Sequence, residues 1–121
     1  MTEEFCAVVF CPMDTTEMCF RPPVIHHNEE FVLATFPFVC LKDPSTEYAM
    51  TMVMSRELID RWGLDETEVL KFLYIEAQER IEARMKSGDL KQTETFAITR
   101  ATHPHAKCPL DLSGIHLPEG T

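Results

Sequence analysis

The sequence predicts an α+β domain in which an antiparallel sheet of about four strands is covered on one face by one long helix, with a short helix at an edge. Three observations lead to this fold class. The stretch from Leu64 to Gly88 has the apolar spacing of a helix, and its start and stop signals agree with that spacing. Two earlier runs alternate as strands do, and the short connection between them favours a hairpin. A length of 121 residues favours a single domain covering 1–121.

The long helix is the best-defined element. Asp65 is placed to accept a hydrogen bond from a free amide of the first turn while Glu68 reaches back, which is a capping box. Gly88 suits a left-handed exit. The apolar side chains recur at three- and four-residue steps and share one face. They are Leu70, Leu73, Ala77, Ile81 and Met85, widened by Val69 and Phe72.

Strands are predicted in the first half of the chain. The first spans Glu4 to Phe10, because its side chains favour strands and Pro12 cannot extend a ladder. Met13 to Pro23 is predicted to be a loop, since it holds turn-favouring and proline residues. The second strand runs from Glu30 to Leu41, and Pro37 interrupts it, which implies a bulge, an edge position or two shorter strands.

A third strand, Tyr48 to Met54, follows a predicted turn at Lys42 to Thr46. Met50, Met52 and Met54 fall on one face of it, and core packing is the favoured interpretation of this stripe. The strand and the preceding one are expected to pair as an antiparallel hairpin.

The remaining elements are shorter. A helix from Arg56 to Trp62 is predicted between a Ser55 cap and Gly63. Thr93 to Thr99 alternates as a fourth strand. From about residue 101 prolines and glycines break any regular element, which predicts an irregular Pro-rich tail. The tail is expected to pack through its apolar residues, Leu110, Leu112, Ile115 and Leu117.

Charge is the unusual feature of the composition. The formal net charge is −9, and residues 1–60, with 10 acids and 3 bases, carry −7 of it. Phosphate repels such a chain, so direct nucleic-acid or anionic-membrane binding is disfavoured. The plain interpretation is that the acids keep a protein soluble. The sharper hypothesis is that the acidic half faces a basic protein partner. The candidate binding residues are Glu17, Glu29, Glu30, Asp43 and Glu47.

The cysteines and the N-terminus predict a cytoplasmic location. Five cysteines form an odd set without a repeated spacing, which favours free thiols in a reducing compartment. The N-terminus has no positive region of the kind that begins a secretion signal. No apolar run approaches the roughly 18 residues that a membrane helix needs.

A metal site is the main alternative to a protein-binding function. His103, His105 and Cys108 form a His-x-His-x-x-Cys pattern that would offer three ligands from one loop. An ordinary polar loop explains the same pattern, so no cofactor is predicted. Glu76, Glu79 and Glu82 resemble a carboxylate site, but Arg80 beside the first two favours a solvated helix face. No catalytic constellation is evident, and an enzymatic function is not favoured.

Part of the chain resembles a known family. Two strand-like runs, Phe36 to Leu41 and Ala49 to Met54, are followed by Trp62-Gly63-Leu64 and by the acidic helix start Asp65-Glu66-Thr67-Glu68. Together with Phe96 to Arg100, this pattern is similar to an uncharacterised domain family of Gram-positive gut bacteria and their mobile elements. The similarity extends from Phe36 to Arg84. The family has no assigned activity, so the resemblance implies no catalytic residues.

These observations lead to a functional hypothesis. The protein is expected to be a small acidic, non-enzymatic binding module, for example an inhibitor that mimics nucleic acid in the basic site of a defence nuclease. The mobile-element resemblance supports an anti-defence role. The alternative is a small metal-binding enzyme that uses the His-x-His-x-x-Cys loop. A housekeeping or assembly subunit without an acidic target is the third possibility.

Overall fold

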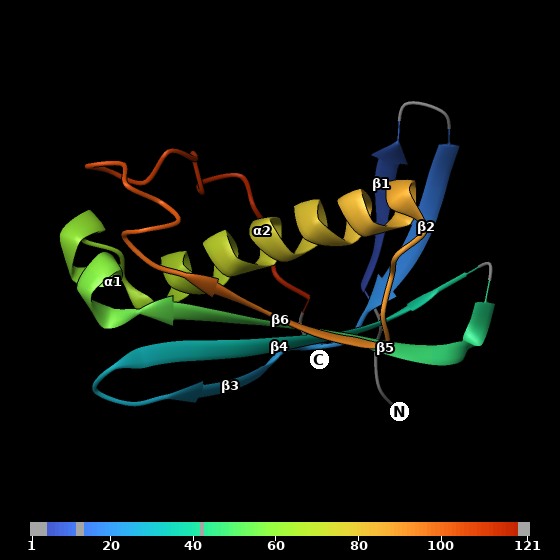
Figure 1. Cartoon of the computed structure of the whole chain (residues 1–121), viewed down its shortest axis with the longest axis horizontal. Coiled ribbons are helices and arrows are strands. Elements are labelled where there is room, and N and C mark those ends of the chain that lie inside the picture. The colour runs from blue at the N-terminus through green and yellow to red at the C-terminus, as the bar shows by residue number, and fades with distance from the viewer. Residues whose placement is uncertain (1–4, 12–13, 42, 119–121) are drawn as a thin grey trace.

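The computed structural model describes residues 5–11, 14–41 and 43–118, with the backbone alone for residues 5–11 and 14–17. This part of the chain forms a sheet, a long helix across one of its faces and a short helix at one end (Figure 1). The elements in chain order are β1 (Phe5–Cys11), β2 (Asp14–Phe20), β3 (Val24–His27), β4 (Phe31–Cys40), β5 (Asp43–Ser55), α1 (Arg56–Trp62), α2 (Glu66–Ser87) and β6 (Thr93–Ile98). The predicted α+β class is confirmed.

The described strands form one sheet in the order β1-β2-β4-β5-β6, and β3 pairs with β4 on the same edge as β2. All neighbours are antiparallel except β5 and β6, which are parallel. A parallel pair needs a long crossover, and here α1 and α2 provide it. The sheet is therefore mixed and has more strands than the four that the sequence predicts.

Two of the described strands were not predicted. The predicted loop from Met13 to Pro23 is wrong for Asp14–Phe20, which forms β2 opposite β1. Val24–His27 adds β3. The turn predicted at Lys42 to Thr46 also belongs largely to a strand, since β5 begins at Asp43. Pairing with distant strands determines these segments, and local turn propensity does not reveal it.

Pro37 does not interrupt β4. The strand continues from Phe31 to Cys40, and its register shifts between Val39 and Cys40 instead. On this edge the β3 ladder ends at Thr35 and the β2 ladder begins at Phe38. Pro37 thus lies between two ladders, where a missing amide hydrogen is tolerated.

Both helices have the predicted ends. Ser55 caps α1 by accepting a hydrogen bond from the amide of Leu58 at 3.3 Å, and Gly63 ends it with φ 67°. In α2, the Asp65 carboxylate accepts from the amide of Glu68 at 2.8 Å, and the Glu68 carboxylate accepts from the amide of Asp65 at 3.0 Å. Gly88 ends α2 with φ 76°.

The core lies between α2 and the sheet. Met50, Met52 and Met54 are at most 1% exposed, which confirms that their stripe packs inward. Leu73 and Ile81 of α2 are fully buried against them. The tail packs on the same core through buried Leu112 and through side chains that are partly buried. These are Leu110, Ile115 and Leu117.

The prediction of free thiols is wrong at Cys19, which is disulfide-bonded. Cys6 stands opposite Cys19 in the β1–β2 register, a relationship hidden from the sequence because β2 was expected to be a loop. In the described part of the chain, Cys40 and Cys108 are free. Burial, reinforced by the charge of Asp43, raises the pKa of the Cys40 thiol.

In the part of the chain that the structure describes, no helix combines the length and the apolar character needed to cross a bilayer.

Candidate functional site

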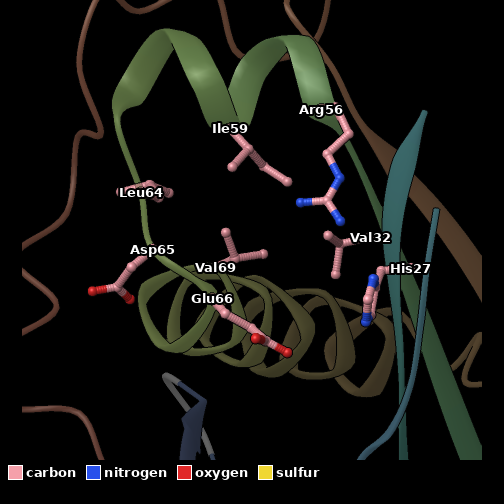
Figure 2. Close-up of a pocket in the computed structure, with 8 residues that line it drawn as sticks. All are labelled: His27, Val32, Arg56, Ile59, Leu64, Asp65, Glu66 and Val69. Atoms are coloured by element: carbon pink, nitrogen blue, oxygen red, sulfur yellow. The ribbon is translucent and has the colours of Figure 1, made fainter. Parts of the chain in front are cut away.

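A hollow of about 90 Å³ lies where α1, the start of α2 and the β3–β4 pair meet (Figure 2). Its floor is apolar, because Val32, Ile59 and Val69 pack there and are at most 5% exposed. Polar side chains stand around this floor. They are His27, Arg56, Asp65 and Glu66. The hollow thus combines an apolar base with groups of both charges.

Local signals in the sequence shape this end of the molecule. The left-handed Gly63 turns the chain between the two helices, where the Leu64 amide donates to the carbonyl of Ile59 at 3.2 Å. Asp65 then caps α2 immediately, so the segment between the two helices is short and its conformation is fixed by the caps at both ends. The turn at Gly63 and the acidic helix start therefore set one wall of the hollow.

Arg56 is held by hydrogen bonds from its backbone amide and its Nε, and its two terminal nitrogens extend beyond these contacts. Its Nε donates to the carbonyl oxygen of Asn28 at 2.9 Å, and its amide donates to the carbonyl of Glu30. The guanidinium extends into the hollow (Figure 2). Within the described residues, no carboxylate forms an ion pair with it. A half-buried guanidinium in this state is a ready partner for an anionic group.

The turn before β4 presents two of the predicted binding residues. The Asn28 side chain accepts hydrogen bonds from the amides of Glu30 and Phe31 at 2.8 and 3.0 Å, which fixes the turn. Glu29 and Glu30 are exposed there, and their carboxylates have no ion-pair partner in the ranges described. The contacts of Arg56 with Asn28 and Glu30 bring this turn beside α1.

Further exposed carboxylates belong to the same end of the molecule. Asp60 lies on α1, while Asp65 and Glu66 begin α2 and line the hollow. None of the three was predicted as a binding residue, because the sequence places Asp60 within the short helix and Asp65 and Glu66 at the start of the long one. Their proximity to Glu29 and Glu30 depends on the β3–β4 turn meeting α1. We call these five residues the acidic end.

The other predicted acids lie elsewhere. Asp43 and Glu47 are at the start of β5, at the opposite end of the β4–β5 hairpin (Figure 1). The Asp43 carboxylate accepts hydrogen bonds from Ser45 and Thr46, and Glu47 pairs with Arg21 at 3.2 Å. Glu17 lies in β2, and its side chain is outside the described part. The structure therefore places Glu29 and Glu30 at one end of the β4–β5 hairpin and Asp43 and Glu47 at the other.

His103, the first residue of the predicted metal loop, contacts α2. Its Nε2 lies 2.5 Å from Oε1 of Glu76, and its Nδ1 lies 2.8 Å from the hydroxyl of Thr102. Glu76 is only 6% exposed, so the expectation that it lies on a solvated face is wrong. The tail covers this side of α2, which the helical spacing alone could not show.

Glu79 is exposed, but buried Glu76 affects the pKa of its carboxyl. Partial burial, a hydrogen bond with Glu76 and the charge of Glu76 raise the pKa of the Glu79 carboxyl above its usual value, against the opposing charge of Arg80. The Glu79 carboxyl therefore favours its protonated form in the folded protein.

The other two residues of the predicted metal loop, His105 and Cys108, form hydrogen bonds elsewhere. His105 is exposed, and its carbonyl accepts a hydrogen bond from the indole of Trp62 at 2.9 Å. The Cys108 thiol donates to the carbonyl of Leu110. Among the described side chains, no group of three or more His, Cys, Asp or Glu is arranged to hold a metal ion.

Comparison with known proteins does not add a relative. No family model matches the chain, and no curated protein or solved structure matches it either. The resemblance of Phe36 to Arg84 to a family of gut bacteria stays a prediction.

Proposed function

We propose that this protein is a small acidic, non-enzymatic binding module that docks on a basic protein partner in the cytoplasm. The observation that carries the proposal is the fixed turn at Asn28, which holds Glu29 and Glu30 exposed and unpaired within the described part of the chain. A turn whose backbone is fixed before binding loses less conformational freedom when a partner arrives.

The surrounding charges favour a cationic partner. Asp60, Asp65 and Glu66 add exposed carboxylates at the same end, and the whole chain carries −9. Such a field accelerates the approach of a basic surface and repels phosphate. A nucleic-acid-binding enzyme, such as a defence nuclease, has a basic surface of this kind, and occupying it would inhibit the enzyme.

The test compares two double variants of equal charge change. Glu29→Lys/Glu30→Lys alters the acidic end, whereas Asp43→Lys/Glu47→Lys alters the opposite end of the hairpin. Proteins captured from host lysate at about 0.05 M and about 0.5 M salt are identified, and each is purified and titrated against the variants. We expect a basic nucleic-acid-binding partner whose affinity falls with salt and falls at least about tenfold with the first variant only. Equal effects of both variants, or binding indifferent to salt, would contradict the proposal.

A further inference from the structure

The hollow at the acidic end has a feature that a basic protein partner does not explain. Arg56 faces into it with a positive charge, beside the exposed carboxylates of Asp65 and Glu66 (Figure 2). A partner's lysine or arginine would be repelled there. The hollow therefore suits a ligand with its own negative group.

The size and floor of the hollow restrict the rest of the ligand. An engineered apolar cavity of about 150 Å³ takes a benzene ring, and this hollow measures about 90 Å³. A branched aliphatic group of about three or four carbons is the size that remains. Val32, Ile59 and Val69 would contact such a group from below.

The rim of the hollow carries a positive group, Arg56, and a negative group, Glu66. The Nε of Arg56 is already used by the carbonyl of Asn28, which leaves the two terminal nitrogens as donors. These match the two oxygens of a carboxylate. On the α2 side, Glu66 is exposed along the rim of the hollow (Figure 2) and offers a carboxylate to a cation.

From this arrangement we infer that the hollow binds a free branched-chain α-amino acid. Arg56 takes its carboxylate, the apolar floor takes its side chain, and Glu66 faces its ammonium group. Such a ligand has no net charge, so the acidic end does not repel it. This ligand site goes beyond the proposed partner binding and does not depend on it.

Calorimetric titration of the purified full-length protein with a series of small ligands tests the inference. L-Leucine and L-valine should bind at submillimolar to millimolar concentrations, while glycine and L-phenylalanine should bind at least about tenfold more weakly because one lacks the side chain and the other exceeds the space. 4-Methylpentanoate and 3-methylbutylamine each lack one charged group and should also bind more weakly. Equal binding of glycine and leucine, or no heat with any amino acid, overturns the inference.

Variants of the rim test the roles of its charges. Arg56→Gln should weaken leucine binding by roughly ten- to a hundredfold, the usual worth of a charge-assisted contact. Arg61→Gln is the matched control, because Arg61 lies on the same helix, is exposed and does not line the hollow. Circular dichroism and thermal melting establish that each variant is folded. An unchanged affinity in folded Arg56→Gln refutes the assigned role.

A C-terminal residue of a peptide offers the same carboxylate and side chain, without the ammonium group. N-Acetyl-L-leucine, which lacks the ammonium group, and the variant Glu66→Gln distinguish a free amino acid from the C-terminal residue of a peptide. If acetylation and Glu66→Gln both weaken binding, the ligand is a free amino acid. If neither does, the assignment to a free amino acid is wrong.

The two functions are separable at the same end of the molecule. Glu29→Lys/Glu30→Lys should weaken partner binding at least about tenfold and leave leucine affinity within about twofold at physiological salt, because screened charges outside the hollow act weakly. Partner binding and leucine binding are thus measured separately, and a negative result for one does not decide the other.

Discussion

Nε2 of His103 lies 2.5 Å from Oε1 of Glu76, which joins the segment after β6 to the middle of α2. The rings of Trp62 and Phe72 flank the imidazole edge-on, with centroids at 6.3 and 5.8 Å. Trp62 also donates to the carbonyl of His105. A tail without regular structure is therefore fixed at its start by one polar pair and two aromatic rings.

Removing the imidazole should loosen this attachment. His103→Ala leaves the buried Glu76 carboxylate without its closest hydrogen-bond partner, so we expect the free energy of unfolding to fall by about 1.5 to 3 kcal/mol. Urea denaturation measures the change, and limited trypsin digestion should cut faster at Lys107. His105→Ala is the control, because that side chain is exposed. Equal effects of the two variants would show that the pair contributes nothing.

Replacing Tyr74 should increase the stability of the protein, whereas replacing His103 should decrease it. The Tyr74 hydroxyl is buried, burial raises its pKa, and it has no hydrogen-bond partner among the described groups. Tyr74→Phe removes an unsatisfied donor and keeps the ring against Phe20 and Phe36. We expect the free energy of unfolding to rise by about 1 kcal/mol. Tyr48→Phe, at a partly exposed position, should change it by less than about 0.5 kcal/mol.

These two sites also show where inference from the sequence succeeds and fails. Asp65, Glu68 and Gly88 define α2 correctly because caps depend on residues a few positions apart. The burial of Glu76 depends on a tail 27 positions away, and no periodicity in the helix reports it. Local signals predict element ends, whereas distant packing decides which polar residue is covered.

The same distinction applies to the candidate site. Glu29 and Glu30 are visible in the sequence as an acidic pair, but Arg56 becomes part of the site only because the β3–β4 turn contacts α1. The strand β3 that carries this turn was itself not predicted. The metal interpretation of His103 failed to anticipate that Glu76 engages one nitrogen of its ring.

The packing of α2 on the sheet predicts graded losses of stability. Leu73 and Ile81 are fully buried, so replacing either by Ala should lower the free energy of unfolding by about 2 to 5 kcal/mol. Leu70 lies on the same helix but is only partly buried. Leu70→Ala should therefore cost less than Leu73→Ala under identical denaturation conditions. If Leu70→Ala costs as much, or the midpoint is unmoved by the buried changes, the burial pattern is incorrect.

The carboxyl of Glu79 gives stability a dependence on pH. Partial burial, the hydrogen bond with Glu76 and the charge of Glu76 raise its pKa above the ordinary value of 4.5, so the folded state favours the protonated form. Its stabilising contribution is complete below that ordinary value and is lost as the pH rises through the folded pKa. Glu79→Gln resembles the protonated form and should raise the urea midpoint at about pH 7 while changing it little at about pH 4. Glu57→Gln is the control, because the Glu57 carboxylate lies 2.9 Å from Nη1 of Arg100, away from Glu79, and loses an attraction when neutralised. A lower midpoint for Glu79→Gln at neutral pH would show that the charged carboxylate is favoured in the folded protein.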